Sequence, residues 1–118
     1  MKGRLAEIRF ERHGEVVLAA LDGEVDSSNA GELLSALGAG VPADVRGLAL
    51  DVAKLSYLDS AGIEMVFSLA GRLRTRRQRL AIAVPKGAPV GRVLDISGVE
   101  SVADVVADVD SAIASLTG

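Results

Sequence analysis

Hydrophobic and polar positions repeat with a period of about two residues in some segments, as in strands, and of about 3.6 in others, as in helices. Near the start, Ile8 and Phe10 alternate with charged residues, which predicts a strand with one covered face. The next run is apolar without interruption, as in a strand covered on both faces. Patterns of these two kinds predict four strands, at 5–11, 16–21, 47–53 and 80–84. A turn at 12–15 separates the first two, and Asp22-Gly23 is a turn signal that predicts the end of the second.

Apolar residues that recur every three or four positions predict helices that bury one face. The clearest set follows a stretch, 54–58, that we expect to be a loop. Its members are Ile63, Val66, Phe67, Ala70 and Leu73. A shorter helix is expected from the N-cap candidates at 26–29 to Leu37, with Gly38 ending it. A third begins with Pro89 as its first residue, a position that proline favours.

The segment after Ser97-Gly98, which ends the third helix, is compatible with two interpretations. Val102 and Val105 suit a short strand followed by a helix with Asp108 as its cap, whereas one long helix from about Ser101 also satisfies the spacing. We expect the strand and the helix. The resulting order predicts a single α/β domain over residues 1–118, with a mixed sheet of four to five strands and about four helices packed on it.

Composition removes most enzyme classes from consideration. The 118 residues contain no Cys and one His, which excludes disulfides, thiolate zinc sites, cysteine nucleophiles and histidine clusters. That histidine, His13, lies in an expected turn, and the chain has no Gly-x-Ser-x-Gly elbow to go with it. The five arginines between 72 and 79 fit a solvated helix end.

The same composition bears on partners and location. A net charge of −3 and few aromatic residues argue against a nucleic-acid partner. No segment approaches the ~20 apolar residues that a membrane span requires. The N-terminus shows no apolar signal core, so we expect a cytoplasmic protein.

The junction between the expected loop at 54–58 and the following helix is the first candidate site. Free backbone N–H groups and the helix dipole meet at such a junction. Asp59 can cap the helix, and Ser60 then lies in its first turn beside the small Ala61 and Gly62. A phosphate on Ser60 would add about −1.5 to −2 charges and would repel a partner docked over the junction. The same residues also fit an ordinary helix cap with no further role.

A second candidate is the acidic stretch around Glu24 and Asp26. If both strand-to-helix junctions share one edge of the sheet, Glu24, Asp26 and Asp59 form an acidic rim. Such a rim could hold Mg²⁺ or meet a basic partner surface. A turn at Gly23 and a cap at Asp26 explain the same residues without any site.

Three segments carry a resemblance to a known family. Residues 21–26 end as Gly-Glu-Val-Asp, residues 48–63 contain Leu-Asp-Ser-Ala-Gly-Ile, and residues 93–99 end as Ser-Gly-Val. In this order and at this spacing, they resemble the STAS domain, and in particular the small free-standing anti-sigma factor antagonists. The resemblance runs over nearly the whole chain.

What the resemblance implies is a partner switch. The unphosphorylated antagonist binds an anti-sigma factor that is also a serine kinase, and phosphorylation of a serine at the start of the second helix abolishes binding. A metal-dependent serine phosphatase then removes the phosphate. By position that serine is Ser60, Asp59 is the aspartate before it, and Asp26 matches an acidic residue near the acceptor. The residues expected at the partner surface are Glu24, Asp26, Asp59, Ser60, Gly62 and Ile63.

Two alternatives remain. STAS domains also serve as accessory subunits of transporter ATPases or other signalling assemblies, where Ser60 need not be phosphorylated. A small Mg²⁺-dependent phosphohydrolase could use Asp59 or Asp26, but no second ligand cluster or general acid is evident. We therefore expect no catalytic residue, no cofactor and no resident metal. The sequence leaves the oligomeric state open.

Overall fold

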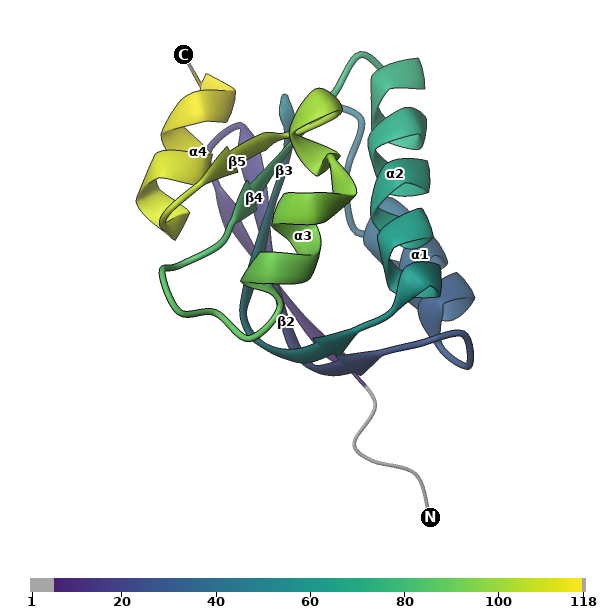
Figure 1. Cartoon of the computed structure of the whole chain (residues 1–118). Helices are drawn as coiled ribbons and strands as arrows, with labels where there is room; N and C mark the ends of the chain where they lie inside the picture. Colours follow the sequence, from purple (N-terminus) through teal and green to yellow (C-terminus); the bar gives the residue numbers. More distant parts are fainter. Residues whose placement is uncertain (1–5, 118) are drawn as a thin grey trace.

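The computed structural model describes residues 6–117, in which helices cover both faces of a five-stranded sheet (Figure 1). In chain order, the elements are β1 (Glu7–His13), β2 (Val16–Val25), α1 (Ala30–Ala39), β3 (Gly47–Leu58), α2 (Ser60–Thr75), β4 (Arg79–Ala83), α3 (Gly91–Ser97), the 3-10 turn η1 (Val99–Ser101), β5 (Asp104–Val106) and α4 (Val109–Thr117). The strands lie in the order β1-β2-β3-β4-β5. Only β1 pairs antiparallel to its neighbour, so the mixed α/β sheet that the order of elements predicts is confirmed.

The central strand β3 sorts its side chains between two cores, as its alternating pattern predicts. Leu48 and Leu50 face the larger core, which α1, α2 and α3 cover. Ala49 faces the smaller core beneath α4, where Leu116 packs against alanines of β3 and β4. Small side chains on this second face let one short helix lie close to the sheet.

Strand β2 does not end at Asp22-Gly23, so the turn expected there is wrong. The strand continues to Val25, and the pairing with β3 shifts register between Ala20 and Asp22 and again between Gly23 and Glu24. Gly23 is buried within the strand with φ of +122°. A glycine accommodates this conformation without the steric cost that a Cβ would bring, so it marks an irregularity in the strand.

The loop expected at 54–58 is also wrong, because β3 runs on to Leu58. Residues 54–58 pair in parallel with residues 22–25 of β2. The pairing of β3 with β4 ends earlier, at Asp51 and Ala83. Within residues 6–117, β1 pairs with β2 only as far as Asp22, so residues 23–25 and 55–58 form a two-stranded extension beyond the rest of the sheet, visible at the bottom of Figure 1.

Helix α1 starts at Ala30 and passes through Gly38, where the sequence predicts its end. The N–H of Gly40 still donates to the carbonyl of Ala36 at 3.0 Å. A glycine in ordinary helical conformation lowers helix stability without ending the helix, and Gly38 has no positive φ.

The C-terminal half follows the expected order. Helix α3 begins at Gly91, so the start expected at Pro89 is wrong by two residues, because Pro89 lies in the turn before the helix. Gly98 ends the helix in the left-handed conformation at φ of +81°. Strand β5 and helix α4 then follow, which confirms the strand and helix and not the single long helix. Asp108 caps α4, because its Oδ1 accepts from the N–H of Ser111 at 2.7 Å.

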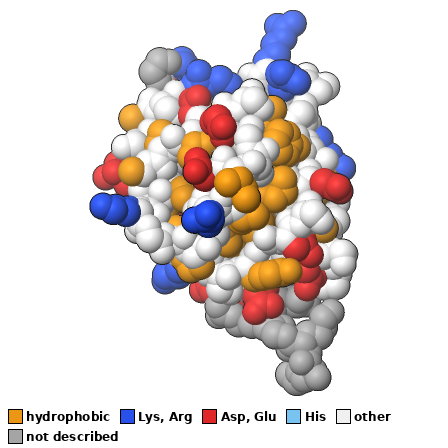
Figure 2. Space-filling view, in the orientation of Figure 1, with side chains coloured by type: hydrophobic (Ala, Val, Ile, Leu, Met, Phe, Trp, Pro, Cys, Tyr) orange, Lys and Arg blue, Asp and Glu red, His pale blue; other side chains and the backbone are white. Residues whose placement is uncertain are grey.

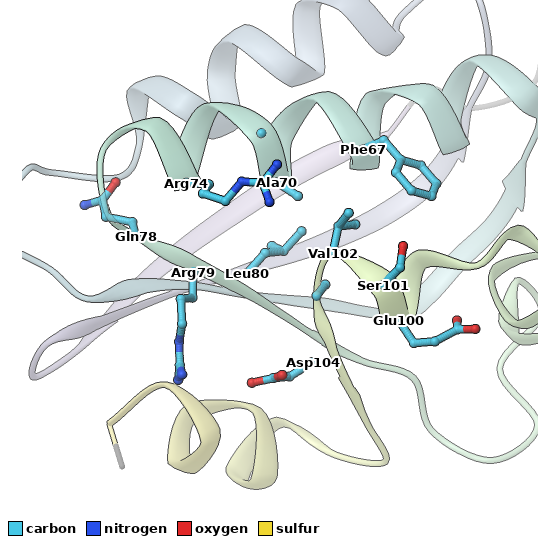
Figure 3. Close-up of a pocket in the computed structure, with 12 residues that line it drawn as sticks. Phe67, Ala70, Arg74, Gln78, Arg79, Leu80, Glu100, Ser101, Val102 and Asp104 are labelled. Carbon is cyan, nitrogen blue, oxygen red and sulfur yellow. The ribbon is translucent and has the colours of Figure 1, made fainter.

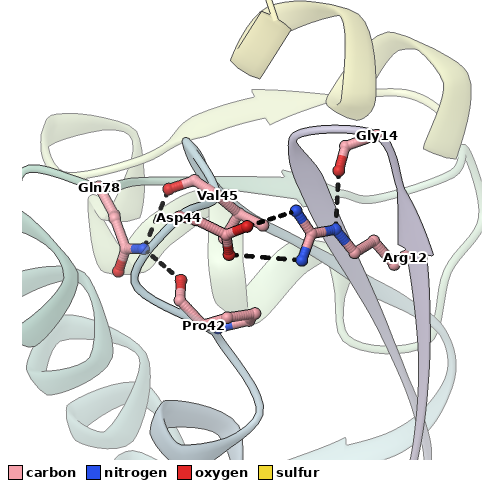
Figure 4. Close-up of polar contacts among 6 residues, drawn as sticks. All are labelled: Arg12, Gly14, Pro42, Asp44, Val45 and Gln78. Atoms are coloured by element: carbon pink, nitrogen blue, oxygen red, sulfur yellow. Dashed lines mark hydrogen bonds and ion pairs between the residues drawn. The ribbon is translucent and has the colours of Figure 1, made fainter.

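The connection between α1 and β3 is held at the opposite end of the sheet from the two-stranded extension (Figure 4). The buried side-chain amide of Gln78 donates to the carbonyls of Pro42 and Val45 at 2.8 and 3.0 Å. Arg12 of β1 forms an ion pair with Asp44 at 3.0 Å. These contacts tie the connection to both β1 and the start of β4.

Candidate functional site

The two-stranded extension brings two strand-to-helix junctions to one corner of the molecule. Val25 and Leu58 are register partners at the ends of β2 and β3, and the N–H of Asp59 donates to the carbonyl of Val25 at 3.4 Å. Asp26 and Asp59 each follow directly on these strand ends. Figure 1 shows the β2–α1 connection and the start of α2 side by side at the lower right. Both acidic segments that the sequence indicates therefore lie together at the end of the sheet where β2 and β3 lead into their helices.

Ser60 is the first residue of α2, and its side chain is exposed. Asp59 precedes it in an extended conformation as the N-cap, and its Oδ1 accepts from the N–H of Gly62 at 3.1 Å. The carbonyl of Asp59 accepts from Ile63 at 3.0 Å, which closes the first helical turn. The cap fixes the direction of the first helical turn and leaves the Ser60 side chain exposed to solvent.

Gly62 is buried and faces the strand ends, not solvent. A Cβ at this position would lie 2.3 Å from Leu58 Cδ1 and 3.2 Å from Val25 Cγ1. The glycine therefore lets α2 approach the ends of β2 and β3 closely. Of the two helix residues expected beside Ser60 at a partner surface, Ile63 keeps part of its side chain accessible, and Gly62 acts through packing.

Asn29 holds the loop between β2 and α1. Its side chain is 4% exposed, its Nδ2 donates to the carbonyl of Glu24 at 2.8 Å, and its Oδ1 accepts from the N–H of Asp26 at 2.9 Å. The carboxylate of Asp26 in turn accepts from the N–H and the hydroxyl of Ser28 at 2.8 and 2.5 Å. Although Asn29 occupies the N-cap position of α1, its side chain makes no capping bond to the helix. The sequence marks it only as a cap candidate, and its role in the loop depends on backbone groups that folding brings together.

Tyr57 is a candidate surface residue that the sequence pattern does not single out. Its side chain is 49% exposed, and it is the register partner of Glu24 across the two-stranded extension. Neighbouring Ser56 donates its hydroxyl to the carbonyl of Gly23 at 3.0 Å, which fixes this part of β3 against β2. Exposed aromatic side chains such as Tyr57 are enriched at protein interfaces.

We call Glu24, Asp26, Tyr57, Asp59 and Ser60 the junction surface. Figure 2 shows acidic side chains gathered at the lower right of the face that carries α2 and α3, where α2 begins. Three carboxylates, a phenol and a hydroxyl suit a partner that offers basic and apolar groups. Within residues 6–117, no three His, Asp or Glu side chains come together in a way that could hold a metal ion, so the magnesium alternative gains no ligand set there.

His13 lies far from the junction surface. It pairs with Val16 at the start of β2, whereas Asp26 follows the other end of that strand, about 30 Å away at ~3.3 Å per residue. Its Nε2 lies 2.5 Å from Glu11 Oε1 on the same strand. The structure therefore gives His13 no contact with Ser60 or Asp59.

A hollow of about 280 Å³ lies at the other end of α2 (Figure 3). Phe67 and Arg74 of α2 line it together with Val102 and Asp104. Arg74 stands 14 residues beyond Ser60 on the same helix, about 21 Å at 1.5 Å per residue. This hollow is thus separate from the junction surface.

No helix within residues 6–117 has the length and apolar character to cross a membrane.

Comparison with known proteins identifies the family. The model of the STAS domain family matches residues 7–112. The chain belongs to the STAS domain family. It is 34% identical over 109 residues to BtrV of Bordetella bronchiseptica, a protein assigned as an anti-sigma factor antagonist, and the match covers 92% of this chain and 93% of BtrV. The family resemblance seen in the three sequence segments is therefore confirmed.

Solved structures agree with the STAS fold. An anti-sigma factor antagonist from Mycobacterium paratuberculosis superposes with a TM-score of 0.84, at 20% identity over 97% of this chain and 96% of that one. The unphosphorylated form of the antagonist SpoIIAA gives a TM-score of 0.68, also at 20% identity, over 95% and 99% of the two chains. These solved structures support the fold of this STAS domain. The similarity to BtrV shows that the domain resembles an anti-sigma factor antagonist.

Proposed function

We propose that this STAS domain is an anti-sigma factor antagonist that works by partner switching. The observation that carries the proposal is the position of Ser60, exposed as the first residue of α2 and next to the end of β2. In its unphosphorylated form, the domain binds an anti-sigma factor that is also a serine kinase, through the junction surface with Ile63 and Gly62 behind it. Binding of the antagonist frees the sigma factor.

Phosphorylation of Ser60 ends this complex. A phosphate there meets the N-terminal end of α2, where the helix dipole and free N–H groups favour negative charge, so the domain stays folded. The same phosphate stands beside Asp59, whose carboxylate already serves as the cap. A partner surface that complements Glu24, Asp26 and Asp59 then faces about −1.5 to −2 additional charges and a bulky group.

In this proposal the domain is a substrate and not a catalyst, and it acts in the cytoplasm with its kinase. A serine phosphatase returns Ser60 to the hydroxyl form and completes the cycle. The hydrogen bonds around Asn29 and the cap at Asp59 preorganise the junction surface, which reduces the ordering cost of binding.

Phosphate mapping tests the acceptor. The purified domain is incubated with ATP and the kinase-type anti-sigma factors of its source organism, and the modified residue is located by mass spectrometry. We expect one phosphate, on Ser60, which Ser60→Ala removes. The matched control is Ser68→Ala, an exposed serine on the same helix, which should leave labelling unchanged. A phosphate reproducibly on another residue, or none with an active kinase, contradicts the proposal.

Binding to the same anti-sigma factor tests the switch. Ser60→Ala should bind like the unmodified domain, and Ser60→Asp should lose ~1–3 kcal/mol of binding free energy. Isothermal titration calorimetry measures both, with Ser68→Asp as the control. Equal binding by Ser60→Asp, together with capture of a transporter ATPase from cells, would favour the accessory-subunit alternative.

A further inference from the structure

Strand β1 leaves one edge of the sheet open. Among the described residues 6–117, β1 pairs with β2 on one side only, and in the sheet order it is the terminal strand. Its side chains are exposed along the seven residues Glu7–His13, apart from half-buried Ile8. An edge of this length presents a row of backbone N–H and C=O groups that can pair with another strand.

The order of the charges on this edge complements itself. Charged residues on an edge strand normally prevent pairing, because like charges meet. On β1 the charges alternate in sign along one face as Glu7, Arg9 and Glu11, and the last residue on this face, His13, contacts Glu11 and is positive only when protonated. In an antiparallel pair of two copies centred on Phe10, Arg9 of each copy lies opposite Glu11 of the other, and Glu7 lies opposite His13.

Neighbouring registers lack this complementarity. A pairing centred on Arg9 places two arginines opposite each other and also sets Glu7 against Glu11. A pairing centred on Glu11 places two glutamates opposite each other. The pairing centred on Phe10 also overlaps the whole strand, whereas the other two overlap five of its seven residues. Charge and length therefore select the same register.

Phe10 occupies the symmetry axis of that register. Phe10 is 41% exposed. The buried side of its ring packs against Gly40, where an added Cβ would lie 2.3 Å from Phe10 Cζ. Opposite residues of an antiparallel pair project from the same face, so the two Phe10 rings would meet side by side. Cross-strand aromatic pairs add to the stability of such a pairing.

We propose that this face is a dimer interface, in which β1 pairs antiparallel with β1 of a second copy about Phe10. Two five-stranded sheets then join into one continuous sheet of ten strands. Both junction surfaces lie outside the pairing, because each begins at Glu24, beyond Asp22, which is the last residue of β2 that pairs with β1. The proposal does not depend on phosphorylation of Ser60 or on the anti-sigma partner.

Disulfide trapping tests the register directly, because the chain has no cysteine of its own. In the proposed dimer, the two copies of residue 10 face each other at a Cα–Cα distance of ~4.5–5.5 Å, which suits a disulfide. Phe10→Cys should therefore form a covalent dimer under mild oxidation. The control is Glu11→Cys, whose two copies are about 8 Å apart in this register and should not bridge. No dimer with Phe10→Cys, or equal amounts with both variants, overturns the proposal.

A charge exchange tests the interface without relying on Phe10. Sedimentation equilibrium of the unmodified chain, up to about 1 mM protein, should show a species of twice the 12.1 kDa monomer mass. Arg9→Glu and Glu11→Arg alone should each weaken dimerisation by about tenfold, since two opposite-charge pairs become like-charge pairs. The double variant Arg9→Glu/Glu11→Arg should restore it, and Arg92→Glu on α3 should have no effect. A monomer at every concentration, or a double variant as weak as the singles, overturns the proposal.

Discussion

The side-chain amide of Asn29 donates to the backbone carbonyl of Glu24 at 2.8 Å, across the loop that leads from β2 into α1. One buried side chain thereby joins the end of a strand to the start of a helix. The second bond of Asn29, from the N–H of Asp26, holds the acidic residue that follows. The Asn29 amide thus holds this half of the junction surface together with the bonds from Ser28 to the Asp26 carboxylate.

Replacing Asn29 by alanine is expected to lower stability. The change removes both hydrogen bonds and leaves the Glu24 carbonyl and the Asp26 N–H without their partner, at a cost of ~1–3 kcal/mol. Urea unfolding measures the free energy of unfolding. Ser35→Ala, at an exposed position on α1, is the control and should stay within about 0.5 kcal/mol of the unmodified domain. If the two variants prove equally stable, the amide does not hold the loop.

Two glycines of α2 should respond oppositely to alanine. Gly71 has open space where the methyl group of an alanine would lie, so Gly71→Ala gains helix propensity and should stabilise by up to about 1 kcal/mol. Gly62→Ala makes the same gain but forces its methyl group to within 2.3 Å of Leu58 Cδ1. Overpacking of this kind costs ~1–3 kcal/mol, which is the difference in unfolding free energy expected between the two variants. Equal values would mean that Leu58 moves aside freely.

Tyr57 should matter for binding more than for folding. Its side chain is half exposed, so Tyr57→Ala should change the unfolding free energy by less than about 1 kcal/mol. If the junction surface binds the anti-sigma factor, loss of this aromatic group should weaken the complex by roughly tenfold or more. Titration calorimetry checks the affinity, with Ile96→Ala as the control because Ile96 is an exposed hydrophobic residue on α3. Unchanged affinity would place the partner elsewhere.

Stability should fall in acid partly through Asp108. The N–H of Ser111 holds the pKa of Asp108 below its ordinary value of 3.8, and the Ser111 hydroxyl lowers this pKa further. A depressed pKa in the folded state means that the carboxylate contributes stability above pH 3.8 and loses it as the pH falls through the lower folded value. Asp108→Asn keeps a capping oxygen and does not titrate. The difference in melting temperature between the two proteins should therefore shrink from pH 5 to pH 2, and a constant difference would exclude this role.

The sequence predicts the layout of the fold because the elements are marked locally. The alternation around Ile8, the unbroken run from Val16 and the helical spacing from Ile63 each lie within one element. The extension of β2 and β3 has no such signal. Asp22-Gly23 has the composition of a turn, and only pairing with residues about 30 positions later makes it part of a strand.

The candidate site divides in the same way. Asp59 and Ser60 follow from the start of a helix, which local sequence marks well. The sequence does not single out Tyr57, because it predicts a loop at 54–58, where the structure has a strand. From the sequence, the small size of Gly62 suggests open space beside Ser60. In the structure, Gly62 packs tightly against Leu58 and against Val25, which is distant in sequence.

The two-stranded extension gives the corner that carries Ser60 a mechanical character different from the rest of the sheet. Strands β4 and β5 end before it, so its resistance to bending comes from two strands and the helices they lead into. A load applied at its tip reaches the first turns of α1 and α2 at the same time, through Asn29 on one side and Asp59 on the other. Bending of this corner would therefore move the starts of α1 and α2 together, whereas the core beneath α4 is built from residues outside the extension.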